Sequence, residues 1–223
     1  VKTLMEPPFF PISFSDRRVG SHFKFRDYRD PASEVLVVHP KGGIKLFDAS
    51  VLQIAEANGN MLSFGNDKFD VRECLVIRMI KSNHPEYTLC YRFEERPTGK
   101  VFVFFTDNEN TDGISNDIKA HLKDADLLVM DCQYKRAVYD ARTAGYGHGT
   151  ADYCVRVALT VNAKKLGLVH HDPSSTDDDI DVIVKEAETA LVRTVSGGAE
   201  GATLGNKGEP YIVAIADYQS FVL

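Results

Sequence analysis

The sequence lacks a hydrophobic run of about 18 residues, which a membrane-spanning helix needs, so a membrane span is not expected. Its first residues, VKTLMEPPFF, lack the basic segment and following apolar stretch of a secretory signal peptide. Positive charge is also scarce. The formal net charge of −6 argues against a general binder of polyanions, although it leaves room for a local basic groove. We therefore expect a cytoplasmic protein.

A CxxC pair is also absent, because the four cysteines are widely spaced: Cys74, Cys90, Cys132 and Cys154. They lie in strand-like or helical runs, where a thiol serves as a small core residue in a reducing compartment. A structural disulfide or a thiolate zinc site is therefore not expected.

The composition is that of an ordinary globular domain, with 223 residues of which 43% are hydrophobic and 26% charged. The apolar pattern predicts strands at 71–80, 88–94, 101–106, 125–131, 166–169 and 211–216 and helices at 115–122, 150–163 and 178–195. Strands and helices alternate in the second half, which predicts an α/β or mixed α+β fold. Residues 31–70, with a strand at 34–38 and a helix at 49–57, are expected to be a small insertion rather than a second domain.

Five side chains that can bind metal or carry protons stand at the ends of expected elements: His84, Asp107, Asp131, His148 and His170. Four of them follow or end a strand, and His148 lies in a glycine-flanked turn before a helix. The carboxyl edge of an open α/β sheet commonly holds its site. Because neutral imidazole binds Zn²⁺ or Mn²⁺ and shuttles protons near pH 7, the pattern predicts a metal-dependent hydrolase.

Each of these residues also has an ordinary structural explanation. A lone histidine such as His22, His39 or His121 is expected to be a surface or capping residue. Asp107 alone could cap the turn that follows it, and the acidic loop 107–112 could be a solvated run of charge. The functional interpretation depends on several candidates occurring together at successive strand ends.

Five short motifs occur in an order that resembles a known family: NHPEYTLCYRFE, FVFFTDNEN, ADLLVMDCQY, GYGHGTADYCVRVA and LGLVHHDPSSTDDDI. They resemble the second half of a metallo-β-lactamase-fold hydrolase. The phosphodiesterase branch, which includes tRNase Z-like enzymes and bacterial cyclic-nucleotide phosphodiesterases, is the most similar. The resemblance covers about residues 71–191, and MEPPFFPISFSD is also similar to that branch. It implies the C-terminal portion of an αββα sandwich.

The resemblance implies a role for each candidate residue. His84 would bind one metal ion, Asp107 would bridge two, and His170 would bind the second. His148 would lie beside the scissile phosphate as a proton donor or charge stabiliser, with Asp131 as its acidic partner. The implied cofactor is a pair of divalent ions, Zn²⁺ or Mn²⁺. His171 competes with His170 as the last ligand, although the register of LGLVH favours His170.

The sequence departs from the family in one respect, because it contains no HxHxDH loop. That loop supplies most ligands of the first half and the water-activating aspartate. The resemblance therefore implies a phosphodiesterase that is active only with a missing HxHxDH-bearing half, from a preceding segment or a partner chain. The alternative is a binding or regulatory module that kept the fold and lost the chemistry.

The acidic composition also bears on the substrate and partners. A nuclease needs a basic path for the nucleic-acid backbone, and the sequence shows only short basic pairs such as Lys164-Lys165 and Arg17-Arg18. A small phosphodiester is therefore expected as the substrate in preference to a nucleic acid. No membrane partner is expected, and a homo-oligomer is compatible with the sequence.

Overall fold

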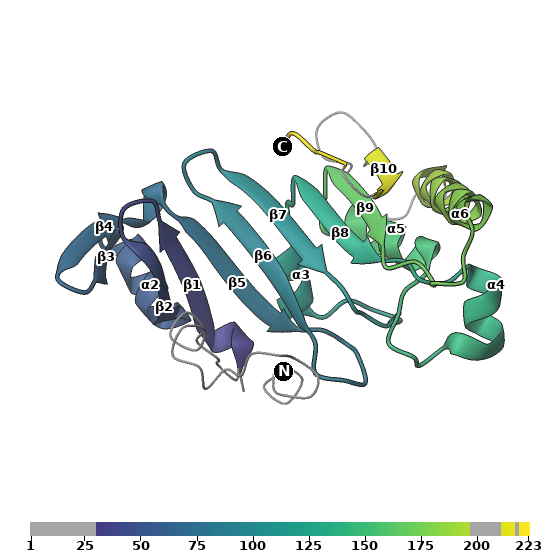
Figure 1. Cartoon of the computed structure of the whole chain (residues 1–223), viewed down its shortest axis with the longest axis horizontal. Coiled ribbons are helices and arrows are strands. Elements are labelled where there is room, and N and C mark those ends of the chain that lie inside the picture. Colours follow the sequence, from purple (N-terminus) through teal and green to yellow (C-terminus); the bar gives the residue numbers. More distant parts are fainter. Residues whose placement is uncertain (1–29, 197–210, 217–218) are drawn as a thin grey trace, which may run out of the picture.

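The computed structural model describes residues 30–196, 211–216 and 219–223. They form an eight-stranded sheet, in the order β10-β9-β8-β7-β6-β5-β1-β2, and a separate hairpin of β3 and β4 (Figure 1). The strands are β1 (Glu34–His39), β2 (Gly43–Asp48), β3 (Met61–Phe64), β4 (Asp67–Asp70), β5 (Leu75–Lys81), β6 (Leu89–Glu95), β7 (Lys100–Phe105), β8 (Leu127–Asp131), β9 (Lys165–Val169) and β10 (Tyr211–Ala214). The helices are α2 (Ala49–Ala57), α3 (Asn116–Leu122), α4 (Arg136–Val138), α5 (Ala151–Thr160) and α6 (Asp177–Ser196). The expected mixed α/β class is confirmed.

Strand β7 divides the sheet into two parts. It pairs antiparallel with β6 and parallel with β8, and the parallel pairing continues through β9 to β10. The expected hairpin between β6 and β7 is present, and Gly99 takes a positive φ of 70° at its turn. Because β7, β8 and β9 run in one direction, their carboxyl ends lie at the same edge of the sheet.

The main core lies between the parallel strands and the helices α3, α5 and α6. Val103 and Phe105 of β7 are buried in it, together with Leu128 and Met130 of β8. The helix α6 contributes a face of its own, made of Ile183, Ala187 and Leu191. Because side chains alternate between the two faces of a strand, every second residue of β7 packs against the helices.

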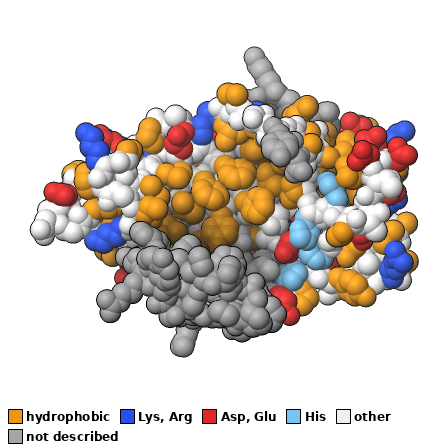
Figure 2. Space-filling view, viewed as in Figure 1, with side chains coloured by type: hydrophobic (Ala, Val, Ile, Leu, Met, Phe, Trp, Pro, Cys, Tyr) orange, Lys and Arg blue, Asp and Glu red, His pale blue; other side chains and the backbone are white. Residues whose placement is uncertain are grey.

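The opposite face of the sheet carries a series of aromatic rings. Phe93 of β6 stacks on Phe102 of β7 with ring centroids 5.4 Å apart, and Phe104 follows 6.5 Å from Phe102. Phe104 is 40% exposed. Figure 2 shows hydrophobic side chains gathered over the middle of this face of the molecule. We call the surface around Phe93, Phe102 and Phe104 the aromatic face.

Residues 31–70 are joined to the main sheet. Strand β1 pairs antiparallel with β5, and β2 pairs with β1 and forms an edge of the sheet. The segment also has a second hydrophobic cluster, which includes Val35, Leu52 and Leu62. The sequence predicted β1 and α2 but not β2. That these residues are an insertion stays a prediction.

Two local differences from the expected elements have clear causes. The expected strand 71–80 begins with a turn of 3-10 helix, Val71–Glu73, because the Asp70 carboxylate accepts a hydrogen bond from the Arg72 backbone amide. A short helical segment, α4 followed by a π-helical turn at Tyr139–Thr143, was not predicted. All four cysteines are buried free thiols, as expected of core residues.

The described helices include none with the length and apolarity that crossing a membrane requires. His22, Arg17-Arg18 and the stretch MEPPFFPISFSD lie outside the described residues.

Candidate metal centre at the edge of the sheet

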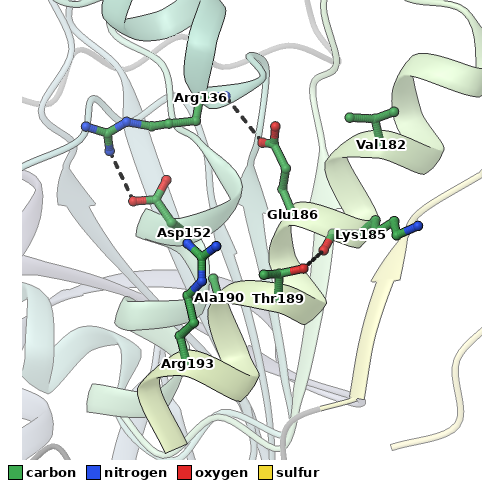
Figure 3. A pocket seen from close by; sticks show the side chains of 8 residues that line it. All are labelled: Arg136, Asp152, Val182, Lys185, Glu186, Thr189, Ala190 and Arg193. Atoms are coloured by element: carbon green, nitrogen blue, oxygen red, sulfur yellow. Dashed lines mark hydrogen bonds and ion pairs between the residues drawn. The ribbon is translucent and has the colours of Figure 1, made fainter. Parts of the chain in front are cut away.

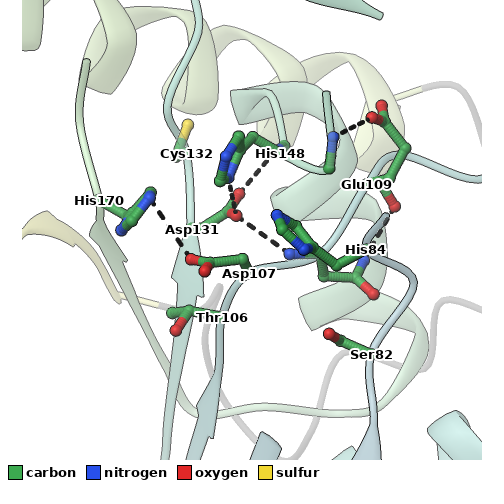
Figure 4. Close-up of polar contacts among 12 residues, drawn as sticks. Ser82, His84, Thr106, Asp107, Glu109, Asp131, Cys132, His148 and His170 are labelled. Carbon is green, nitrogen blue, oxygen red and sulfur yellow. Dashed lines mark hydrogen bonds and ion pairs between the residues drawn. The ribbon is translucent and has the colours of Figure 1, made fainter. Parts of the chain in front are cut away.

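Three potential metal ligands converge beyond the carboxyl ends of the parallel strands: Asp107, His148 and His170. One ligand atom from each lies within 4.8 Å of the others. The Nε2 atom of His170 is 3.4 Å from Oδ1 of Asp107, and the rings of His148 and His170 stack with centroids 4.9 Å apart (Figure 4). We call these three residues the ligand cluster.

The parallel pairing of the strands explains this convergence. Asp107 follows β7 and His170 follows β9, while β8, the strand between them, ends in Asp131. His170 takes a left-handed backbone conformation, with φ of 59°, directly after its strand. The chain therefore turns sharply at the residue whose ring lies against Asp107.

Asp131 lies behind His148 and is buried. Its Oδ2 atom lies 3.0 Å from Nδ1 of His148 and accepts a hydrogen bond from the Asn108 amide, while Oδ1 accepts one from the Gly149 amide at 2.6 Å. The hydrogen bond with Asp131 raises the pKa of His148 above its usual value, although desolvation by burial works against the increase. The carboxylate thus fixes the orientation of the ring and leaves Nε2 as the nitrogen that is not bonded to Asp131.

The turn that carries His148 depends on close backbone packing. Gly147 takes a φ of 100°, and its amide donates a hydrogen bond of 2.7 Å to Oε2 of Glu109. Glu109 also accepts a hydrogen bond from the hydroxyl of Tyr139, which lies in the π-helical turn. Glu109 was not among the candidates predicted from the sequence, where its place two residues after Asp107 is the signal that could have indicated it.

His84 lies beside the ligand cluster but is not one of its three members. Its ring is 5.3 Å from that of His148, centroid to centroid, and its Nδ1 accepts a hydrogen bond from the Glu86 amide. The expected triad of His84, Asp107 and His170 is thus only partly brought together, because His148 occupies the third place. The roles assigned to these residues stay predictions.

His171, the competing ligand, is engaged elsewhere. Its Nδ1 atom lies 3.1 Å from the carbonyl oxygen of Cys132, and its Nε2 is buried. The structure therefore places His170, and not His171, in the ligand cluster.

One carboxylate and two imidazoles form a donor set that suits Zn²⁺ or Mn²⁺. A carboxylate that holds the far nitrogen of a histidine, as Asp131 does, is a common arrangement behind a metal-ligating ring. The same arrangement also suits a proton donor, because it favours the charged ring. In Figure 2 the histidine side chains lie at the border of the exposed hydrophobic area.

A hollow elsewhere on the molecule is lined by none of the five predicted site residues. It encloses about 450 Å³ and is lined by Asp152 of α5, Arg136 of α4 and the outer side of α6 (Figure 3). Ion pairs with Asp140 and Asp152 occupy the Arg136 guanidinium. Because none of its lining residues belongs to the ligand cluster, this hollow is not part of the candidate site.

No family model matches the sequence. A ribonuclease Z from Treponema denticola is 24% identical over 97 residues, which are 44% of this chain and 30% of that protein. The resemblance to the metallo-β-lactamase-fold phosphodiesterases is confirmed. The chain spans less than a third of the length of the matched relative, so the match does not by itself establish the activity of the whole protein.

The chain is also similar to three solved structures. The metallo-β-lactamase fold protein YhfI from Bacillus subtilis is 20% identical, with a TM-score of 0.42 over 69% of this chain and 49% of that one. The short form of human tRNase Z is 20% identical, with a TM-score of 0.39 over 52% and 42% of the two chains. A long form of RNase Z from yeast is 14% identical, with a TM-score of 0.37 over 61% and 17%.

The expectation of a small phosphodiester in preference to a nucleic acid is wrong. The protein matched by sequence is by its name a ribonuclease, whose substrate is a nucleic acid. The expectation rested on the net charge of the whole chain, which does not describe the charge along a local binding path.

Proposed function

We propose that this chain forms part of a metal-dependent phosphodiester hydrolase that acts on RNA. The observation that carries the proposal is the convergence of Asp107, His148 and His170, with the buried carboxylate of Asp131 behind His148. The sequence match to a ribonuclease Z supports RNA as the substrate class.

Asp107 and His170 would hold a divalent ion, and His84 would contribute a ligand toward a second. Bound Zn²⁺ or Mn²⁺ would supply Lewis acidity and a water of lowered pKa at neutral pH. The position of the His84 ring, 5.3 Å from that of His148, supports its part in this set, and its Nδ1 is bonded to the Glu86 amide, which leaves Nε2 as the nitrogen that would bind a metal.

The protein's own contribution centres on His148. Its Nε2 would donate a proton to the leaving oxygen of the phosphodiester, while Asp131 keeps the ring in the required tautomer. The raised pKa of His148 supports this role, because it keeps the ring protonated closer to neutral pH. Glu109 would hold the turn in place through the Gly147 amide.

The reaction would also require an HxHxDH loop, which these 223 residues do not contain. We propose that another segment or a partner chain supplies it and packs on the aromatic face. The exposure of Phe104 on that face supports this, since large apolar patches on soluble proteins commonly mark contact sites. The histidine side chains lie at the border of the same hydrophobic area in Figure 2.

The test combines metal analysis with RNA cleavage. The chain is mixed with a polypeptide that bears the HxHxDH loop, and hydrolysis of a tRNA transcript with extra nucleotides at both ends is followed. Asp107→Ala should lower both the bound Zn²⁺ or Mn²⁺ and the cleavage rate, whereas Asp112→Ala, an exposed acid of the same loop, should change neither. Equal metal content and cleavage in the two variants would refute the proposal.

His148→Ala separates the two roles that its geometry allows. Loss of turnover with the metal content intact supports the proton donor, whereas loss of metal makes His148 a ligand. The sequence feature that favours the rival function, an inactive binding or regulatory module, is the absent HxHxDH loop. Two equivalents of metal in the completed protein support the enzyme, and none supports the module.

A further inference from the structure

Asn108 is buried directly after Asp107 of the ligand cluster, with 2% of its area exposed. Both polar atoms of its side chain are bonded. Its Oδ1 accepts a hydrogen bond of 3.1 Å from the Asn83 amide, and its Nδ2 donates to the Glu109 carbonyl and the Tyr153 hydroxyl. Because an amide accepts only at oxygen and donates only at nitrogen, these three partners fix the orientation of the side chain.

The backbone of Asn108 is tied to the other side of the site. Its amide donates a hydrogen bond of 3.0 Å to Oδ2 of Asp131, and the same oxygen bonds to Nδ1 of His148 (Figure 4). The position of Asn108 is therefore set by the buried carboxylate that also orients the His148 ring.

The loop that carries His84 is attached to the site through Asn83. His84 follows β5 and Asp107 follows β7, but these strands are not neighbours in the sheet, because β6 lies between them. Their loops are joined directly instead. The Asn83 amide donates to Oδ1 of Asn108, and the Asn83 carbonyl accepts a hydrogen bond of 2.7 Å from the Glu109 amide. Both backbone polar groups of the residue before His84 are thus held by the loop after β7.

We propose that Asn108 is the positioning residue that brings the His84 ring to the candidate metal centre. The connection runs from Asp131 through the Asn108 backbone to its side chain, and from there to the Asn83 amide. Groups that orient a metal ligand without touching the ion commonly change metal affinity about 10- to 100-fold when they are replaced. The inference rests on the proposed function in one respect, since it takes His84 to be a ligand.

The test locates the His84 ring by NMR in the full chain. The wild type should show nuclear Overhauser contacts between the His84 ring and the α-protons of Gly147, which lie against each other, and between the stacked rings of His148 and His170. Asn108→Leu keeps a side chain of similar size but offers no acceptor. It should lose the first contact and keep the second, which reports an intact ligand cluster. Retention of the His84 contact in this variant would overturn the inference.

Tyr153→Phe is the matched control. It removes another buried hydrogen bond of the Asn108 side chain but leaves the acceptor for Asn83 in place. Both contacts should therefore persist in this variant. Loss of the His84 contact in Tyr153→Phe to the same extent as in Asn108→Leu would show a general effect on packing, which contradicts a positioning role.

Hydrogen exchange in the wild type keeps the inference testable if Asn108→Leu does not fold. The Asn83 amide should exchange about a hundredfold more slowly than an amide without a hydrogen bond, because its acceptor is held in the buried part of the site. Exchange at the rate of an unbonded amide would overturn the inference.

Metal binding connects the position of the ring to the proposed chemistry. In the chain completed by an HxHxDH-bearing polypeptide, Asn108→Leu should bind the second Zn²⁺ about 10- to 100-fold more weakly, and Tyr153→Phe should bind it as the wild type does. Equal affinities in Asn108→Leu and the wild type would overturn the inference. If the His84 contact depends on Asn108 but the completed protein binds no metal, the positioning role stands and the proposed function is rejected.

Discussion

Gly147 shows how closely the backbone packs at the candidate site. A Cβ atom at this position would lie 2.6 Å from Nε2 of His84 and 2.7 Å from Cδ of Pro85. The residue also needs a φ of 100°, which side chains other than glycine rarely adopt. Both constraints act on the turn that places His148.

Gly147→Ala should destabilise the fold by roughly 2–4 kcal/mol, because backbone strain adds to the overlap with His84. Gly145→Ala is the matched control. It has a similar φ of 89° but nothing within 4 Å of the added Cβ, so it should show the backbone strain alone. Urea denaturation of both variants measures the difference, and equal losses would contradict the packing argument.

His121 was expected to be a surface or capping residue but is buried, with 6% of its area exposed. Burial lowers its pKa to about 4, and the nearby Arg92 guanidinium contributes in the same direction. His39 is buried as well, although it caps a turn as expected, since its Nδ1 accepts hydrogen bonds from the Lys41 and Gly42 amides. The sequence does not reveal such burial, because it depends on which elements cover the residue.

The lowered pKa of His121 gives a defined pH dependence. Between about pH 6.5 and 4 the unfolded chain binds a proton there that the folded chain does not, so stability falls as the pH falls. At about 1.4 kcal/mol per pKa unit the loss amounts to roughly 3 kcal/mol. As the pH is lowered from 7.5 to 4, the free energy of unfolding of His121→Leu should therefore rise relative to that of the wild type by about that amount. Denaturant unfolding across this range checks it, and a constant difference would contradict it.

At the scale of elements, the start of α6 is fixed by a reciprocal cap. The Thr176 hydroxyl donates to Oδ2 of Asp179 and accepts from the Asp179 amide, and the same carboxylate oxygen accepts from the Thr176 amide. Asp179 also pairs with Lys135, which joins the helix to the segment that follows β8. Asp179 therefore both caps the helix and ties its start to the segment after β8.

Thr176→Ala should lower the melting temperature by about 2–4 °C, as expected for loss of an N-cap in a chain of this size. Thr189→Ala is the control. Thr189 lies inside the same helix, where its hydroxyl bonds to the Lys185 carbonyl and caps no helix end, so its replacement by a stronger helix former should cost nothing. Thermal unfolding of the two variants should separate them. Equal melting temperatures would show that the cap contributes nothing.

The elements differ in how far the sequence could predict them. The apolar alternation of β7 and the continuous apolar run of β8 indicated these strands correctly, and the carboxyl-edge rule placed Asp107, Asp131 and His170 together. β2 was missed because GIKLFD follows a turn and leads directly into a helix. The π-helical turn was missed because YDART has no apolar periodicity. His84 could be located next to the site, but whether it reaches the ligand cluster depends on loop geometry beyond sequence patterns.

At the scale of the whole molecule, the aromatic face explains how the two parts of the proposed enzyme would associate. Phe104→Asp should abolish activation by the HxHxDH-bearing polypeptide, because a charge would be buried between the two sheets. The unfolding midpoint of the chain alone should change little, since Phe104 is 40% exposed there. Cleavage assays and sedimentation of the mixture measure the effect.

Ile54→Asp provides the control for this experiment. Ile54 is 62% exposed on α2, so the same charge there should leave association and cleavage intact. If both variants were activated like the wild type, the aromatic face would not be the contact surface.

The left-handed backbone of His170 has a consequence for the protein's evolution and engineering. A non-glycine residue at a φ of 59° costs about 1–2 kcal/mol, which glycine would avoid. His170→Gly should therefore melt a few degrees higher than the wild type while losing a member of the ligand cluster. A library selected for heat resistance alone would drift away from histidine at this position. One selected for turnover should keep it, so the two enrichment profiles would diverge at residue 170.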